Sequence, residues 1–245
     1  MSAIANPGDA APQQPDPAEL EAIRTAYLAS ASFADVLTRA TKFAGDIQAL
    51  VDLTPSMGVS TADAMALCAR ELQFAAVLGR SGMFRPAFGA VRLALEAVSW
   101  GVYLSTDEIA SRRWLSNIED LKWSSSVSGD RGALTEAFAT IFFPSLSVFS
   151  NSYLTRAQTL YRDLSGFVHG EVRTHALTLA IEFNPELMQR LKDASQELVE
   201  IALFMYTVRF LDGLSRIDRV SEDALVETLG HLEPMRTRLE TLERN

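Results

Sequence analysis

The stretch from Phe84 to Leu104 constrains the fold most strongly, because it is apolar on most of its helical circumference. Its only charged residues are Arg85, Arg92 and Glu96. A helix of this kind is stable only when other elements surround it, so we expect a central helix of a bundle. No apolar run in the chain reaches the roughly 18 residues that a membrane span needs, so we expect no membrane insertion.

Apolar residues recur at helical spacing along most of the remaining chain. Asp16-Pro17 and Asn184-Pro185 are helix starts, in which an N-cap residue precedes a proline at the first helical position. We expect Thr61 and Thr106 to cap two further helices. The predicted helices cover 17–31, 33–53, 61–80, 84–104, 106–123, 133–149 with a break at Pro144, 151–169, 185–214 and 221–243. The fold class is therefore an all-α bundle of roughly eight helices.

The two segments that do not follow this pattern lie near the start of the chain and between the last long helices. Residues 1–16 are rich in Ala, Pro, Gly, Gln and Asp, and we predict a disordered tail. Residues 171–183 mix alternation with β-branched residues, and we predict a short helix or an extended connection. The domain organisation is then this tail followed by a single helical domain at 17–245.

Cysteine usage and charge narrow the class of protein. The single Cys68 excludes a disulfide framework and a cysteine zinc cluster, and together with the lack of a signal peptide it favours the cytoplasm. The net charge is −9, with −5 in residues 1–69, −5 in 176–245 and +1 in 70–175. This balance argues against a protein that coats nucleic acid by bulk charge. It leaves room for a small arginine-lined site in the middle third.

The segment from Leu160 to Glu171 (LYRDLSGFVHGE) places Arg162 and His169 seven positions apart near the end of a predicted helix. Seven residues are close to two turns, so the two side chains share one face and lie about 10 Å apart along it. Tyr161 lies on an adjacent apolar stripe, and Gly170 is a candidate C-cap. A large cation beside a titratable ring can serve phosphate chemistry, and it can also serve structure.

The RDLSGFVH run resembles the motif of the HEPN superfamily of all-helical domains. In that family four to six residues separate an Arg, usually followed by a polar residue, from a His; here Asp163 follows Arg162, and six residues lie between Arg162 and His169. The earlier VRLALE segment, with Arg92 and Glu96, is similar to the arginine- and glutamate-bearing core helix of these domains. The resemblance covers about residues 60–215.

The resemblance implies a metal-independent endoribonuclease in a toxin–antitoxin or phage-defence setting, with an antitoxin or defence protein as partner. His169 would transfer the proton of a ribose 2′-hydroxyl, and Arg162 would stabilise the charge of the phosphorane. It also implies a homodimer with two motifs facing each other, and a two-fold axis would indeed supply a second acid or base. Asp163 or Ser165 would orient the imidazole, and Tyr161 would stack on a base. No cofactor is implied.

Two alternatives use the same residues differently. Arg92 and Glu96 lie in the most apolar helix and must be paired if they are buried, so Arg162 and His169 are plausible structural partners in a non-catalytic scaffold or binding protein. Ser165 then bonds only to its own helix backbone. A regulatory bundle that binds a small ligand or nucleotide near Arg92 and Glu96 is the third possibility.

Other candidate sites have weaker sequence support. His169, Glu171 and His175 do not have the spacing of a standard zinc site, so we expect no metal. Arg112-Arg113 beside Trp114 would contact nucleic acid by charge and stacking, but an ordinary solvated helix face with one buried Trp explains them better. We expect the third histidine, in the acidic C-terminal segment, to be a solvated surface residue.

Overall fold

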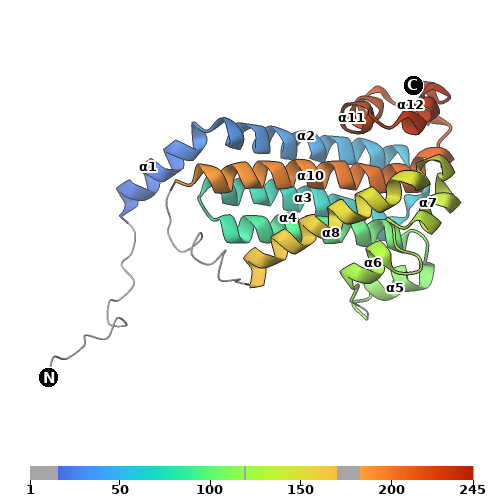
Figure 1. Cartoon of the computed structure of the whole chain (residues 1–245), viewed down its shortest axis with the longest axis horizontal. Helices are drawn as coiled ribbons and strands as arrows, with labels where there is room; N and C mark the ends of the chain where they lie inside the picture. Colours follow the sequence, from blue (N-terminus) through green and yellow to red (C-terminus); the bar gives the residue numbers. More distant parts are fainter. Residues whose placement is uncertain (1–15, 119, 170–182, 245) are drawn as a thin grey trace.

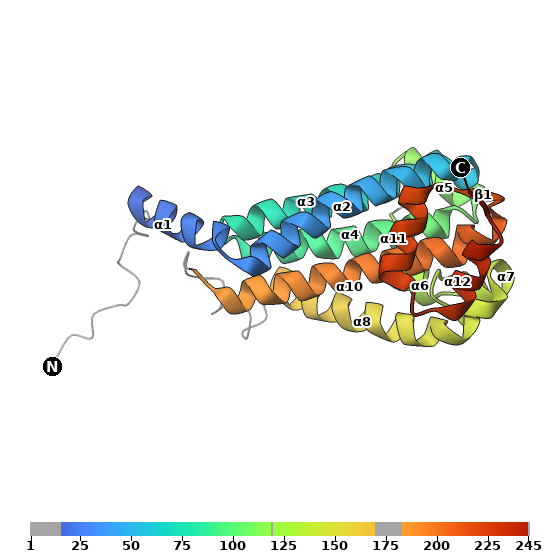
Figure 2. The same ribbon diagram turned by 90° about the horizontal axis from the view of Figure 1, so that it is seen from above.

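Five long helices lie side by side and form the body of the molecule, as Figure 1 shows. The computed structural model describes residues 16–118, 120–169 and 183–244. The long helices are α2 (Ala31–Leu53), α3 (Val59–Arg80), α4 (Phe84–Leu104), α8 (Ser147–His169) and α10 (Pro185–Phe210). Figure 2 shows α3 and α8 on opposite sides of the bundle. The predicted all-α class is confirmed.

Shorter elements cover the two ends of the bundle. Helix α1 (Pro17–Leu28) extends from one end, and the remaining short elements gather at the other (Figures 1 and 2). These are η1 (Pro55–Met57), α5 (Glu108–Leu115), α6 (Trp123–Ser128), α7 (Glu136–Phe142), η2 (Pro144–Leu146), η4 (Leu211–Gly213), α11 (Arg219–Leu229) and α12 (Glu233–Glu240). Strands β1 (Arg216–Ile217) and β2 (Glu243–Arg244) form a short parallel pair beside α11 and α12.

Helix α4 is the central helix that its composition predicted. It packs against α3, α8 and α10, and most of its side chains are buried. By length and composition it is the one helix of the described chain that is apolar enough to cross a membrane, but 67% of its most apolar window is buried inside the bundle. The apolar surface of α4 is therefore used for packing between helices.

A close crossing of α3 and α4 depends on Gly101. A Cβ added there would lie 3.0 Å from the Cβ of Ala64 and 3.3 Å from the carbonyl oxygen of Thr61. The Thr61 hydroxyl donates to the carbonyl of Gly101 at 2.8 Å, so this side chain links the two helices. Thr61 was predicted to cap the third helix; that prediction is wrong, because α3 already begins at Val59.

Other helix ends show which capping signals were reliable. Asp16 and Asn184 cap α1 and α10 through their side chains, with proline next in each case, as predicted. The fifth helix is capped by Asp107 and not by Thr106, whose hydroxyl donates back to Tyr103. An Asp side chain accepts the Ala110 amide there, and the shorter Thr side chain remains on the preceding helix.

Three segments differ from the predicted helices, and the described residues contain 11 α-helices instead of roughly eight. The helix predicted at 106–123 ends at Leu115, two residues before Asn117 adopts a left-handed φ of 53°. Helix α6 begins at Trp123 and continues to Ser128, within 124–132, where no helix was predicted. The predicted helix 221–243 is divided into α11 and α12. Pro144 does break 133–149, as predicted. The tail at 1–15 and most of 171–183 lie outside the described residues.

Candidate functional site

Helix α8 turns its apolar stripe inward and its motif residues outward. The buried positions are Tyr153, Ala157, Leu160, Leu164 and Phe167, which recur at spacings of three and four. Because 3.6 residues make a turn, this stripe leaves the face that holds positions 162 and 169 toward solvent. The helix begins one turn earlier than predicted, at Ser147, and ends at His169.

Arg162 and His169 are both exposed on this outward face. Arg162 has no hydrogen bond or ion pair to another residue within the described part of the chain. The Nε2 atom of His169 lies 3.5 Å from Nη1 of Arg92, which comes from α4. A guanidinium can only donate, so Nε2 accepts from Arg92 only in the tautomer that carries its proton on Nδ1.

Arg92, Glu96 and Tyr161 form a cluster beside the His169 ring. Nη2 of Arg92 lies 2.6 Å from the Tyr161 hydroxyl and 3.2 Å from Oε1 of Glu96, and the hydroxyl donates to the same carboxylate oxygen at 3.0 Å. The Arg92 and Glu96 side chains are only 18% and 17% exposed. Burial raises the pKa of Tyr161; the hydrogen bond from Arg92 opposes this rise and the Glu96 carboxylate reinforces it. The Arg92–Glu96 ion pair thus forms within the chain, while Nε of Arg92 is buried without a hydrogen-bond partner among the described residues.

The ring of Tyr161 packs against side chains from two other helices. It stacks on Trp123 of α6 at 4.5 Å between centroids and 3° between planes. The guanidinium carbon of Arg92 lies 4.6 Å from the same ring centroid. The ring that was expected to stack on an RNA base therefore stacks on Trp123 within the chain.

Ser165 and Asp163 do not contact the imidazole among the described residues. The Ser165 hydroxyl donates to the carbonyl of Tyr161 at 2.7 Å, which is the backbone role considered above. Asp163 is exposed and faces a groove between α8 and α10. Neither side chain orients His169 in this arrangement.

Arg85 is a neighbour of the motif that sequence reasoning did not single out. Its Nε and Nη2 atoms donate to the carbonyls of Phe167 and Val168, each at 3.1 Å. A guanidinium at this position satisfies carbonyls that the last helical turn leaves free and complements the helix dipole. The signal was present in the sequence, because Arg85 and Arg92 are seven residues apart and so share one face of α4.

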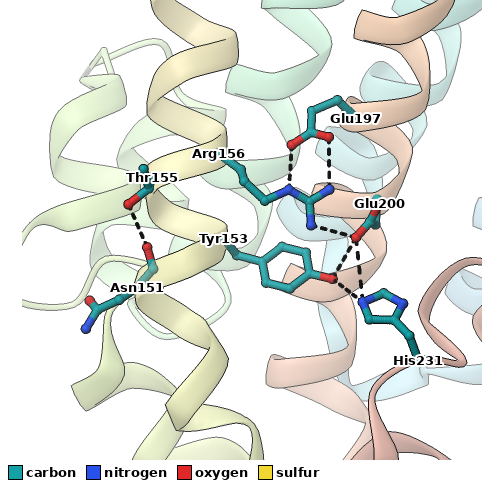
Figure 3. A network of polar contacts seen from close by, with 7 residues as sticks. All are labelled: Asn151, Tyr153, Thr155, Arg156, Glu197, Glu200 and His231. Atoms are coloured by element: carbon teal, nitrogen blue, oxygen red, sulfur yellow. Dashed lines mark hydrogen bonds and ion pairs between the residues drawn. The ribbon is translucent and has the colours of Figure 1, made fainter.

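A second polar network lies nearer the N-terminal end of α8, as Figure 3 shows. Arg156 donates to both carboxylate oxygens of Glu197, at 2.6 and 2.9 Å, and to Glu200 at 2.6 Å. The Tyr153 hydroxyl donates to Glu200 at 2.9 Å and lies 3.3 Å from Nε2 of His231. The hydrogen bond from Arg156 holds the pKa of Glu200 below its usual value.

This network joins three parts of the molecule, namely α8, α10 and the C-terminal segment. His231 lies between α11 and α12, with its side chain 55% exposed and Nε2 3.8 Å from Glu200. It was predicted to be a solvated surface residue, and it is half solvated but also contacts this network. The spacings of Tyr153 and Arg156 on α8 and of Glu197 and Glu200 on α10 are both i, i+3, which was the only sequence signal available.

The remaining residues that the sequence suggested as sites, Arg112 and the candidate metal set, add little to this site. Arg112 forms an ion pair on its own helix with Glu108, at 2.6 Å, and both side chains are 77% exposed. No group of three metal-binding side chains occurs in residues 16–118, 120–169 and 183–244. Of the candidate metal set, Glu171 and His175 lie outside these ranges.

Comparison of the chain with protein-family models, with curated proteins and with solved structures gave no match.

Proposed function

We propose that this chain is a HEPN-like, metal-independent endoribonuclease that acts as a homodimer. The observation that supports it is the exposed face of α8, on which Arg162 and His169 point outward while the apolar stripe is buried. A cation without a carboxylate partner among the described residues is available to bind a phosphate. The fold class of the resemblance agrees with the all-α bundle.

The chemistry assigned to each group follows from its position and contacts. His169, whose Nε2 atom lies 3.5 Å from Nη1 of Arg92, takes the proton of the attacking ribose 2′-hydroxyl. Arg162 stabilises the charge that develops on the phosphorane, and Arg92 contributes a second positive charge beside the ring. Arg85 keeps the end of α8 in place by binding its last carbonyls.

The proposal includes a second copy because one chain supplies one motif histidine. In-line attack by the 2′-hydroxyl uses a base on the nucleophile and an acid on the leaving oxygen. A two-fold axis beside the outward face of α8 would provide both groups from two identical motifs. An antitoxin or defence-system protein that covers this face is the partner that the resemblance implies.

The test is cleavage of single-stranded RNA in the presence of EDTA. We expect wild type to cleave, and His169→Ala and Arg162→Ala each to lose at least about a hundredfold in rate. His231→Ala is the matched control, because it removes another exposed imidazole outside the motif, and it should cleave like wild type. Light scattering should give a dimer. Equal cleavage by His169→Ala, or no cleavage by wild type, would refute the enzyme.

A non-catalytic scaffold is the second candidate, and the Arg92–Glu96–Tyr161 cluster favours it. Those three side chains and Trp123 contact one another and link α4, α6 and α8. In that case the protein would not cleave RNA, and substitutions of Arg162 and His169 would have no effect in the cleavage assay. Tyr161→Phe would then change only stability.

A further inference from the structure

An open groove runs between α8 and α10, with α4 beneath it. Its volume is about 430 Å³. This size falls within the roughly 300–1,000 Å³ that is typical of small-molecule sites, which often lie between the helices of bundles. On α8 the groove runs from Thr155 to Phe167, and its lining residue Asp163 is about 100° around the helix axis from Arg162, so the groove occupies a side of α8 next to the motif face.

The floor of the groove is apolar and well ordered by packing. It is formed by Phe88 of α4, Leu160, Leu164 and Phe167 of α8 and Ala194 of α10. The rings of Phe88 and Phe167 stack at 4.1 Å between centroids, and each is at most 2% exposed. An aromatic or aliphatic body that enters the groove would displace the Arg190 guanidinium from the Phe167 ring and would lose water, while the core below stays in place.

The charges around the groove favour a cation. Asp163 stands on α8 and Asp193 on α10; Asp163 has no ion pair within the described residues, and Asp193 accepts only from Gln189, at 2.8 Å. Arg190 is the lining cation that lacks a carboxylate partner among those residues, and its guanidinium lies over the Phe167 ring at 4.9 Å. The two carboxylates of Asp163 and Asp193 therefore outnumber the single guanidinium of Arg190.

The other lining cation does not change this balance. Arg156 is shared between Glu197 and Glu200, so that group of three carries a net charge of −1. Glu200 does not line the groove, so the lining residues alone, with three carboxylates and two guanidinium groups, carry a net charge of −1. A ligand of opposite sign gains from this field, and one of the same sign is repelled.

We propose that the groove binds a small monocationic amphiphile, whose apolar or aromatic body lies on the phenylalanine floor. Its ammonium group sits between the carboxylates of Asp163 and Asp193. This site is separate from the ribonuclease proposal and does not depend on it, because none of its floor or carboxylate groups takes part in the proposed cleavage.

The test compares two probes that share one apolar body and differ in charge. Naphthylethylamine carries an ammonium group at neutral pH, and naphthylacetate carries a carboxylate. Isothermal titration calorimetry and thermal unfolding of the full chain should show binding and stabilisation by the amine. The acid at the same concentration should give neither effect.

Variants of exposed residues locate the site without disturbing the core. Thr159→Trp fills the groove from its α8 rim and should abolish amine binding, while Gln158→Trp, the next exposed residue but outside the groove, should leave it unchanged. Replacing both rim acids, Asp163→Asn with Asp193→Asn, should weaken the amine about tenfold. Thermal unfolding of each variant without probe establishes that it is folded.

Three results would overturn the proposal. The first is no amine binding to wild type at probe concentrations of about a millimolar, which corresponds to a binding free energy of about −4 kcal/mol. The second is equal or tighter binding of naphthylacetate. The third is amine binding that survives in the folded Thr159→Trp variant, which would place the probe elsewhere.

Discussion

Removal of the Arg156 guanidinium should destabilise the protein substantially. Its three short hydrogen bonds to Glu197 and Glu200 join α8 to α10, and the three side chains are 29%, 31% and 19% exposed. Exposed pairs contribute about 0–1 kcal/mol, and breaking a fully buried pair costs about 3–5 kcal/mol. For this intermediate burial we expect Arg156→Met, which keeps the apolar stem, to cost about 2–3 kcal/mol.

The assay is thermal and urea unfolding followed by circular dichroism. A chain of this size loses about 2–4 °C in Tm per kcal/mol, so the expected drop is about 4–12 °C. The matched control is Arg112→Met, because the Arg112–Glu108 pair is also an arginine–glutamate pair at 2.6 Å but is 77% exposed on both sides. The control should change stability by no more than about 0.5 kcal/mol.

The pH dependence checks the cause of this loss. Hydrogen bonding by Arg156 lowers the pKa of Glu200 from its ordinary 4.5, so its contribution is present above that value and disappears as the pH falls through the lower folded pKa. In Arg156→Met this contribution is absent. The stability difference from wild type should therefore be largest near pH 7 and shrink below pH 4.5. A difference no larger than that of Arg112→Met, or one independent of pH, would refute the reasoning.

Three further predictions concern the core and the motif cluster. Cys68 is fully buried and burial raises the pKa of its thiol, so a thiol reagent should label it only as fast as the protein unfolds; rapid labelling of native protein would contradict this. Gly101→Val should cost about 2 kcal/mol in urea unfolding because of the close Ala64 contact, whereas Gly45→Val, with open space around it, should be near neutral. Tyr161→Phe should cost about 1–2 kcal/mol by removing the hydroxyl that accepts from Arg92 and donates to Glu96, and an unchanged unfolding midpoint would contradict this.

The long helices could be predicted from the sequence because each has a continuous apolar stripe and most have a local start signal. Asp16-Pro17 and Asn184-Pro185 place helix starts correctly because the capping contact involves only neighbouring residues. Helix α6 could not be predicted in this way. Its serine-rich sequence favours a loop, and it is stabilised by contact with α4, where the Ser126 and Ser99 hydroxyls lie 2.9 Å apart.

The candidate site could likewise be predicted only in part from the sequence. The shared face of Arg162 and His169 follows from helical spacing alone, and both side chains lie on it. The partners of Tyr161 could not be predicted, because Trp123 reaches it from a helix that the sequence does not indicate. Contacts such as Arg156 with Glu197, 41 positions apart, depend on how whole helices pair.

The most direct test of the account is the end group left on the RNA. If the outward face of α8 performs transesterification, wild type in EDTA should leave fragments that end in a cyclic phosphate, detectable by mass spectrometry, and His169→Ala should leave none. Intact RNA with wild-type dimer, or the same cyclic-phosphate fragments with His169→Ala, would contradict the claim that Arg162 and His169 act on RNA.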